Sequence, residues 1–382
     1  DIHCPDGERK KSKIKIAYIS ADFKNHPISF LTAELFEVHN RDRFEIIGVS
    51  VSASNDEMQQ RVSKAFDHFL ELHGRSDDEI VSLLRGLNID IAIDLGGYTQ
   101  DSRFGVFARR VAPIQMSYLG FLGTTGSDCI DYIIADPEII PEASQKFYTE
   151  KIAYLPSYQV NDRKRKASDR IFTRSEFGIP ENAFVYCCFN NNYKLMPEVF
   201  ASWMNILERV ENGVLLLYAE NDAVRENLKK EAVKKGVDPG RLFFGERLSQ
   251  IDYLARFKIA DLFLDTAPYN AGTTASDALW MDVPVLTRQG ETFACRVASS
   301  ILRAIDLPEL ITHSVGEYEA LACELGQNPE KMSLLKSKLM TNKATKALFD
   351  TPRFTRNLER LFEIALAKHL NGEKPSHIQV ED

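Results

Sequence analysis

The stretch LDTAPYNAGTTASDALWMDVPVLTRQGETFACRV, residues 264–297, joins the end of an apolar strand to a turn of small residues and then to a helix. This order is the repeating unit of parallel α/β sheets. Gly272, Thr273 and Thr274 stand where the helix would begin, and the free N–H groups and dipole of a helix N-terminus favour an anion. A plainer interpretation is that a threonine only caps the helix. The turn is therefore either a phosphate site or an ordinary cap.

The same alternation runs through the rest of the chain. Short apolar runs alternate with amphipathic stretches, as in sheets built from βαβ units. The expected strands are 14–20, 45–51, 90–95, 114–119, 131–136, 184–189, 214–219, 242–244, 261–265 and 284–287. The expected helices are 28–40, 57–68, 77–87, 101–110, 197–210, 222–235, 249–258, 274–281, 292–305, 315–325, 329–342 and 352–370. This pattern predicts an α/β protein with two doubly wound, Rossmann-like domains followed by C-terminal helices.

The chain has 382 residues, enough for two domains of ~100–200 residues each. A polar stretch at 157–183 separates the two halves. We expect a tail at 1–13, a first domain at 14–160, a linker at 161–180, a second domain at 181–350, a helix at 351–372 and a tail at 373–382. Ligands of such sheets bind at the carboxyl ends of strands, so we expect the domains to face a cleft that holds the site. The helix at 352–370 is able to cross back to the first domain.

The composition of the chain argues against some classes of partner. Hydrophobic residues make up 44% and charged residues 27%, as in a soluble globular protein, and the net charge of −8 argues against a nucleic-acid partner. No run reaches the ~20 apolar residues of a membrane helix and the N-terminus lacks a signal peptide, so we expect no membrane partner and a cytoplasmic location. Six cysteines without CxxC spacing are expected to be reduced core residues: Cys4, Cys129, Cys187, Cys188, Cys295 and Cys323.

Further polar residues follow the strands of the second half. FNNNYK, residues 189–194, places an amide cluster and one cation after a strand. Asp277 comes one turn after the small-residue turn, where its carboxylate can accept from ribose hydroxyls, and RQGETF, residues 288–293, marks another loop–helix junction. Each feature alone is also ordinary surface or capping chemistry. Together they suit a nucleotide diphosphate, with candidate donor-binding residues Asn190, Asn191, Lys194, Gly272, Thr273, Thr274, Asp277, Glu291 and Thr292.

The first half offers a second set of loops. ADFKNHPIS, residues 21–29, carries a histidine before a proline just after the first strand. A lone histidine is usually structural, but a loop position favours catalysis or substrate contact. Two glycine-rich turns, DLGGYT and YLGFLGTTGSD, follow other strands. The candidate residues for the acceptor or sugar side are His26, Pro27, Gly97, Tyr98, Thr99, Gly123, Thr124 and Thr125.

The order of these motifs along the chain resembles that of a known protein family. DFKNHPIS, DLGGYT, RVAPIQMSYLGFLGTTGSDCIDYIIAD, FNNNYK, LDTAPYNAGTTASDALWMDVPVLT and GETFACRVASSIL resemble the catalytic region of protein O-GlcNAc transferases over residues 14–370. The resemblance implies a GT-B glycosyltransferase that is inverting and metal-independent, needs no cofactor, and moves GlcNAc from UDP-GlcNAc to Ser or Thr of a protein or peptide acceptor. Such enzymes usually carry upstream tetratricopeptide repeats. We expect a catalytic fragment or a relative without repeats.

The resemblance also implies individual roles. Lys194 resembles the lysine that contacts the diphosphate, and Thr273 and Thr274 resemble the threonines that hold it. Asp277 resembles the ribose-binding aspartate, and His26 the active-site histidine proposed as a base. The chain shows no DxD motif of the kind that holds a metal ion beside a nucleotide sugar, which agrees with the metal-free expectation.

At two positions the sequence differs from the common pattern of the family, so alternatives to this function stay open. Gly272 stands where many members have histidine, and Asn191 where many have glutamine. The similar SPINDLY branch, which transfers fucose from GDP-fucose, has glycine before its threonine pair. The alternatives are a protein O-fucosyltransferase or an enzyme with another donor, a small-molecule or glycan acceptor, a UDP-sugar 2-epimerase, and an inactive module that only binds a nucleotide sugar.

Overall fold

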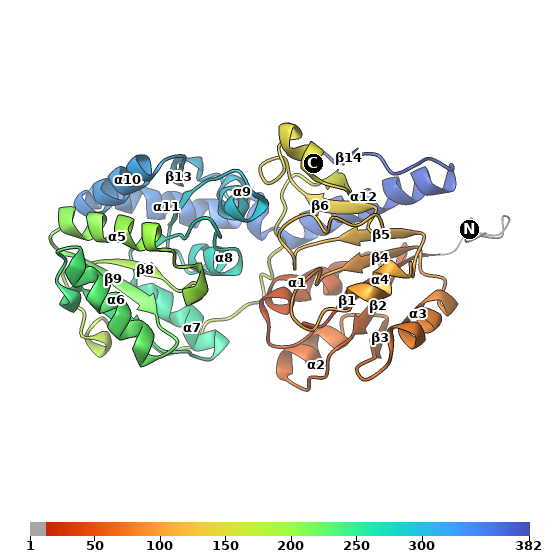
Figure 1. Ribbon diagram of the computed structural model, residues 1–382, viewed down its shortest axis with the longest axis horizontal. Coiled ribbons are helices and arrows are strands. Elements are labelled where there is room, and N and C mark those ends of the chain that lie inside the picture. Colours follow the sequence, from red (N-terminus) through yellow and green to blue (C-terminus); the bar gives the residue numbers. More distant parts are fainter. Residues whose placement is uncertain (1–12) are drawn as a thin grey trace. The chain divides into compact units, whose positions relative to one another are not determined.

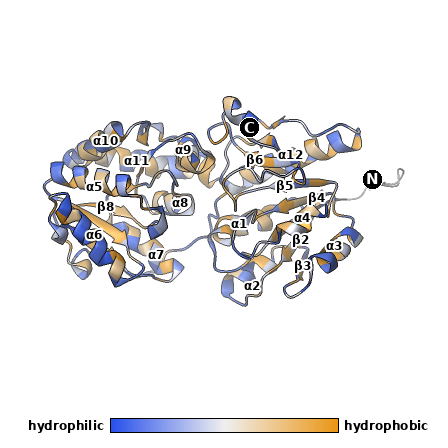
Figure 2. Ribbon diagram, in the orientation of Figure 1, coloured by the Kyte–Doolittle hydropathy of each residue, from blue (hydrophilic) through white to orange (hydrophobic). Residues whose placement is uncertain are grey.

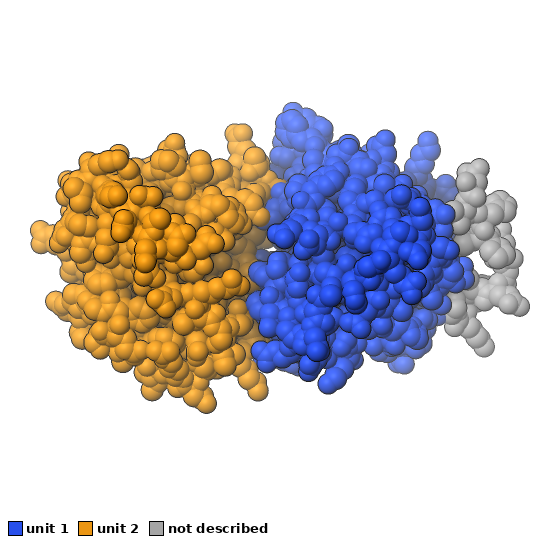
Figure 3. Space-filling view, turned by 60° about the horizontal axis from the view of Figure 1, so that its bottom comes forward, with its two compact units in different colours: residues 1–164, 347–382 blue, residues 165–346 orange. Residues whose placement is uncertain are grey.

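The computed structural model describes residues 13–382, which divide into two compact units (Figure 3). The first unit comprises the described chain up to residue 164 together with residues 347–382, and the second comprises residues 165–346. Cys4 and all but the last residue of the expected tail at 1–13 lie outside the described residues. Strands of both units are largely apolar, whereas most helices have one apolar and one polar side (Figure 2). Within residues 13–382, no helix is both long and apolar enough to cross a membrane.

The first unit is one parallel sheet covered by helices (Figure 1). Its strands lie in the order β14-β7-β6-β5-β4-β1-β2-β3. They are β1 (Ile14–Ser20), β2 (Phe44–Ser50), β3 (His68–Glu71), β4 (Ile91–Asp94), β5 (Ile114–Ser117), β6 (Tyr132–Ala135), β7 (Lys151–Tyr154) and β14 (Ile378–Gln379). Its helices are α1 (Pro27–Val38), α2 (Glu57–Ser63), α3 (Asp77–Gly86), α4 (Phe104–Ala108) and α12 (Thr351–Leu370). The central strands are mostly buried on both faces, which is why they are largely apolar.

Helix α12 belongs to the first unit although it follows the second in sequence. It packs beside α1 and β5, where the Glu359 carboxylate accepts from the Asn40 backbone N–H at 2.7 Å and bonds to the buried His39 Nδ1 at 2.9 Å (Figure 1). The segment expected as a tail at 373–382 contains β14, which pairs with β7. Its apolar residues Ile378 and Val380 are buried, and two residues are too short a run to indicate a strand in the sequence.

The second unit is a six-stranded parallel sheet in the order β10-β9-β8-β11-β12-β13. Its strands are β8 (Phe184–Cys188), β9 (Gly213–Tyr218), β10 (Leu242–Gly245), β11 (Leu262–Leu264), β12 (Val285–Arg288) and β13 (Ile311–Thr312). Its helices are α5 (Pro197–Arg209), α6 (Asp222–Lys234), α7 (Gln250–Arg256), α8 (Thr273–Trp280), α9 (Val297–Ala304), α10 (Val315–Gln327) and α11 (Pro329–Thr345).

Most expected elements are present, and the differences are local. The sequence did not indicate β3, β7, β13 or β14, which have two to four residues and lie at or near sheet edges. The helix expected at 57–68 ends at Ser63, because the chain then enters β3. The helix expected at 292–305 begins only at Val297, after a 3₁₀ turn at Phe293–Cys295.

Candidate functional site

In each unit, two of the candidate loops follow the strands on either side of the point where the strand order reverses. In the second unit this point lies between β8 and β11, which precede FNNNYK and the NAGTT turn, residues 270–274. In the first unit it lies between β1 and β4, which precede the loops of His26 and Gly97. Doubly wound sheets bind ligands at such points because neighbouring loops diverge there. The loops of Gly123 and Glu291 follow β5 and β12, one strand further from these points. The structure thus places both sets of predicted residues after the carboxyl ends of strands in their own sheets.

Lys194 connects the two loops of the second unit. Its Nζ donates to the backbone oxygen of Asn270 at 3.0 Å and lies 4.1 Å from the centre of the Tyr269 ring. Burial lowers the pKa of Lys194 to about 8, while the charges of Asp265 and Cys188 act in the opposite direction. Lys194 is therefore a largely desolvated cation at neutral pH beside the NAGTT turn.

The start of α8 is not capped by a side chain. Gly272 occupies the N-cap position with no side-chain hydrogen bond, and the helix begins at Thr273. The hydroxyl of Thr274 bonds instead to the half-buried Tyr253. The alternative of a plain threonine cap is therefore wrong. Because no side chain caps this end, its first-turn N–H groups are suited to an anionic ligand.

Asp277 is buried one turn into α8 and forms an ion pair with Arg165. Arg165 Nη1 lies 2.6 Å from Asp277 Oδ1, and the two side chains are 7% and 3% exposed. Burial raises the pKa of Asp277 to about 6, and Arg165 opposes this shift. The predicted ribose contact of Asp277 thus involves a carboxylate that already has a partner.

The other predicted donor-side residues are less closely grouped. Asn190 is buried, and its side-chain nitrogen donates to Thr266 Oγ1 at 2.8 Å. Asn191 is exposed and accepts from the Tyr193 backbone N–H at 3.4 Å. Glu291 and Thr292 are exposed and precede the 3₁₀ turn instead of a helix. Their contact with a donor stays a prediction.

In the first unit, His26 is the N-cap of α1 and Pro27 is its first residue. The Nδ1 atom accepts from the Ile28 backbone N–H at 3.3 Å and lies 3.6 Å from Asp22 Oδ2. Burial lowers the pKa of His26, although the Asp22 charge raises it. A neutral imidazole that accepts at Nδ1 carries its proton on Nε2. Action of Nε2 as a base therefore requires the proton to move to Nδ1, on the side of Asp22.

The two glycine-rich turns of the first unit pack against each other. Tyr98 donates to the Thr125 backbone oxygen at 2.8 Å, and Thr99 donates to the Gly96 backbone oxygen at 2.9 Å. Gly97 has φ of 59°, and a Cβ there would lie 2.4 Å from Phe121. This position therefore requires glycine.

The turn at 123–126 is held by the buried carboxylate of Glu150. Its oxygens accept from the Thr125 N–H and the Thr124 hydroxyl, both at 2.6 Å. Gly123 carries no side chain and stands at the start of this turn. Glu150, a residue of another loop, therefore holds this turn in place.

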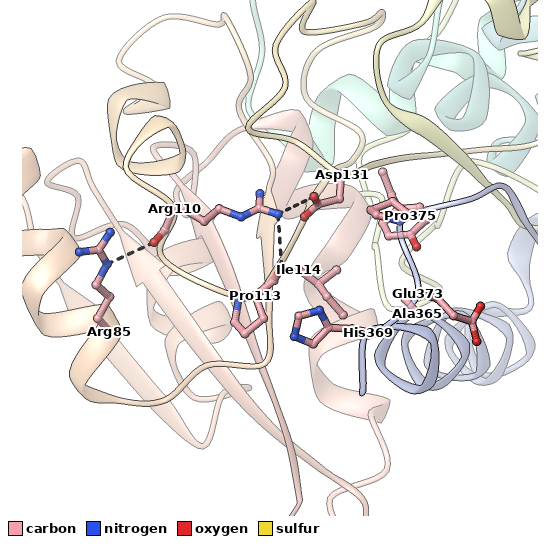
Figure 4. Close-up of a pocket in the computed structure, with 10 residues that line it drawn as sticks. Arg85, Arg110, Pro113, Ile114, Asp131, Ala365, His369, Glu373 and Pro375 are labelled. Atoms are coloured by element: carbon pink, nitrogen blue, oxygen red, sulfur yellow. Dashed lines mark hydrogen bonds and ion pairs between the residues drawn. The ribbon is translucent and has the colours of Figure 1, made fainter. Parts of the chain in front are cut away.

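A surface cavity of about 500 Å³ lies at the opposite edge of the first sheet (Figure 4). It is lined by Arg85, Arg110, Pro113, Ile114, Asp131, Tyr132, Ala365, His369, Glu373 and Pro375. Ile114 and Tyr132 are the first residues of β5 and β6, so the cavity is at the amino ends of these strands. Arg110 is already paired with Asp131 at 2.5 Å. None of the predicted site residues lines this cavity, so its volume does not indicate the site.

Sequence reasoning missed several residues around the predicted ones, including Asp265, Arg165 and Glu150. Asp265 had a signal, because a carboxylate directly after an apolar strand lies at the binding edge of a sheet. Arg165 and Glu150 had none, since each contacts a segment distant in sequence. Among residues 13–382, no three His, Cys, Asp or Glu side chains come together in a group that would hold a metal ion.

Comparison with known proteins identifies the family. Residues 2–169 and 161–358 match glycosyl transferase family 41. The chain belongs to this family. The family 41 chain is 38% identical over 376 residues to the probable UDP-N-acetylglucosamine–peptide N-acetylglucosaminyltransferase SEC of Arabidopsis thaliana, with 96% of this chain and 38% of the plant protein covered. The probable transferase SPINDLY of Petunia hybrida is 28% identical, with 98% and 41% covered. The chain thus spans about two fifths of the length of these relatives.

The family 41 chain also resembles a solved structure. A mutant of the Thermobaculum terrenum O-GlcNAc transferase is 28% identical with a TM-score of 0.87, and the match covers 94% of this chain and 69% of that one. A putative UDP-N-acetylglucosamine 2-epimerase from Listeria monocytogenes has a TM-score of 0.53 at 18% identity, which shows a shared fold alone. The predicted α/β fold of GT-B type and the predicted family are confirmed.

Proposed function

We propose that the chain transfers GlcNAc from UDP-GlcNAc to Ser or Thr hydroxyls of proteins, by an inverting reaction that needs no metal ion. The observation that carries this proposal is the contact of Lys194 with Asn270, in the loop that leads into the uncapped start of α8, at the reversal point of the second sheet. The names of the relatives support the choice of donor and of a peptide acceptor.

The proposed chemistry is a single in-line displacement at the anomeric carbon, which inverts its configuration. The bond to the diphosphate breaks as the acceptor oxygen attacks, so negative charge grows on the leaving UDP. The Lys194 ammonium and the first-turn N–H groups of α8 would stabilise that charge, in the place that a metal ion occupies in other transferases. The acceptor hydroxyl loses its proton, and His26 with Asp22 is the candidate group to receive it.

One residue supports a second candidate donor, GDP-fucose. Gly272 stands at the N-cap of α8, where many relatives that use UDP-GlcNAc are expected to have histidine. Glycine at this position is the pattern expected for a GDP-fucose donor. The second candidate is therefore a protein O-fucosyltransferase with the same leaving-group chemistry.

The test is a transfer assay on a panel of Ser- and Thr-containing peptides and on cell proteins, with UDP-GlcNAc or GDP-fucose, with and without EDTA. We expect GlcNAc transfer that EDTA does not reduce. The Lys194→Met variant should lower turnover by about 10²- to 10³-fold, as the loss of a preorganised charge does. Lys230→Met, in which an exposed lysine of α6 is replaced, is the matched control and should leave turnover unchanged.

Other outcomes would replace the proposal. Transfer from GDP-fucose alone would establish the second candidate. Conversion of UDP-GlcNAc without any acceptor would indicate an epimerase, and UDP binding without turnover would indicate a binding module. Loss of transfer in EDTA that added Mg²⁺ restores would refute the metal-free mechanism.

A further inference from the structure

Asp265 lies at the carboxyl end of β11, with 3% of its surface exposed, and its carboxylate organises the loop that follows. The Oδ1 atom accepts from the backbone N–H groups of Thr266 at 2.8 Å and Ala271 at 2.7 Å. The Oδ2 atom accepts from the Thr287 hydroxyl on β12 at 2.6 Å. One carboxylate thus ties both ends of the loop at 266–271 to the neighbouring strand.

The same loop receives Lys194. Its residues Tyr269 and Asn270 supply the ring and the backbone oxygen that the Lys194 ammonium contacts. From the other loop, Asn190 donates to Thr266 Oγ1 at 2.8 Å and lies 3.5 Å from Asp265 Oδ1. Both loops of the site therefore rest on the Asp265 carboxylate and its direct partners.

We propose that Asp265 is a positioning residue that holds the loop at 266–271 in the shape that receives Lys194, and supplies the negative charge that keeps Lys194 protonated. This inference rests on the proposed function, because it assigns Asp265 to the same donor site. It adds a residue that would act on the leaving diphosphate only through Lys194.

The charges around the pair support this role. Apart from Asp265, the titratable groups beside Lys194 are Cys188 and Tyr269, and burial raises the pKa of both, so both are neutral. Tyr318 faces Asp265 and donates to its backbone oxygen at 3.1 Å, and burial raises the pKa of Tyr318, so it is neutral as well. Arg288 lines the same small cavity as Asp265 and adds positive charge. Asp265 is therefore the anion that balances Lys194.

Stability alone does not account for this carboxylate. Burial raises the pKa of Asp265 to about 6, above the value of 3.8 for a free aspartate. A group with a raised folded-state pKa contributes stability at low pH, and that contribution is lost as the pH rises through about 6. At neutral pH the ionised form of Asp265 thus stabilises the fold less than its protonated form would, and such perturbed groups cluster at functional sites.

The test measures UDP-GlcNAc binding against pH by calorimetry, for the wild type and for Asp265→Asn. The diphosphate of this donor keeps its charge between about pH 6 and about pH 9, so the change in affinity reports on the protein. In the wild type, affinity should fall as the pH rises through about 8, where Lys194 loses its proton. In Asp265→Asn the midpoint of this fall should move down by about 1 pH unit or more, because an opposite charge has been removed.

A purely structural role would give a different result. If Asp265 only shaped the loop, Asp265→Asn would weaken binding equally at every pH and leave the midpoint unchanged, and that outcome would overturn the proposal. The matched control is Asp261→Asn, which removes a carboxylate paired with Arg174 at 2.9 Å just before the other end of β11 and should not move the midpoint. Failure of the wild type to bind UDP-GlcNAc would refute the proposed function itself, which separates the two failures.

A second measurement covers the case in which Asp265→Asn does not fold. The NMR signal of the Lys194 side chain, assigned by its absence in Lys194→Met, is followed in the wild type from about pH 5 to about pH 9. Besides its own titration near pH 8, it should respond near pH 6, where Asp265 takes up a proton. A Lys194 signal with no response near pH 6 would overturn the proposal.

Discussion

Replacing Arg165 by methionine should destabilise the second unit more than any exposed ion pair could. The change keeps an apolar side chain of similar length but leaves the Asp277 carboxylate buried without its cation. Both side chains are more than nine-tenths buried, and Arg165 also lies 5.7 Å from the Trp280 ring. Removing one partner of a buried pair costs about 3–5 kcal/mol. For a unit of this size, each kcal/mol lowers the unfolding midpoint by about 2–4 °C, so we expect a loss of about 6–20 °C.

The stability lost in Arg165→Met should depend on pH, and the ionisation of Asp277 sets the direction of that dependence. Burial raises the pKa of Asp277 to about 6, so the wild-type pair is intact above this pH and is lost as Asp277 gains a proton below it. In Arg165→Met, the pKa of Asp277 rises further because the opposing cation is gone. The difference in stability between wild type and variant is therefore largest near pH 8, shrinks as the pH falls towards about 6, and is lost below about 6, where Asp277 is protonated in both proteins.

The assay is thermal and urea unfolding of the wild type, Arg165→Met, Asp277→Asn and the double variant at pH 8 and pH 5. We expect the double variant to recover part of the loss, since the unpaired charge is removed. Arg170→Met is the matched control, because its ion pair with Glu176 is 51% and 38% exposed and should contribute less than about 1 kcal/mol. A loss below 1 kcal/mol at pH 8, or an equal loss at both pH values, would refute this reasoning.

Three further substitutions test how the first unit holds its loops and its last helix. Gly120→Ala would place a Cβ 1.9 Å from the Leu95 backbone oxygen, and should cost about 1–3 kcal/mol in urea unfolding. Glu150→Ala leaves the N–H and hydroxyl groups of the turn at 123–126 without their acceptor, so hydrogen exchange in this turn should speed up by at least about tenfold. Glu359→Ala leaves the buried Nδ1 atom of His39 without its partner and should lower the protection of α12 by about 1–3 kcal/mol in hydrogen exchange.

Each of these expectations has a control. Gly316→Ala, where a Cβ meets nothing within 4 Å, should be neutral or stabilising by up to about 1 kcal/mol. An unchanged urea midpoint for Gly120→Ala would mean that the strand ends separate easily. Unchanged exchange at 123–126 or in α12 would mean that the Glu150 or Glu359 carboxylate is not what orders that segment.

Much of the fold was predictable because its signals are local. A strand of four or more apolar residues between polar turns, or a helix with an apolar face, is indicated by neighbouring residues alone. Strands of two residues, such as β13 and β14, carry too few residues to give such a signal. The loop residues of the candidate site were predictable for the same reason, since FNNNYK and NAGTT directly follow apolar strands.

The sequence by itself thus determined the α/β class, the two halves and the loops that carry the candidate residues. Only the tertiary structure decided that β8 lies beside β11, that α12 joins the first unit, and that Asp277 pairs with Arg165, 112 residues away. The physical reason is that backbone periodicity depends on neighbours along the chain, whereas strand order and buried charge pairs depend on which distant segments exclude water from each other. Asp265 shows both kinds of information. Its position directly after β11 can be read from the neighbouring sequence, whereas its partners Thr287 and Ala271 are brought to it only by the fold.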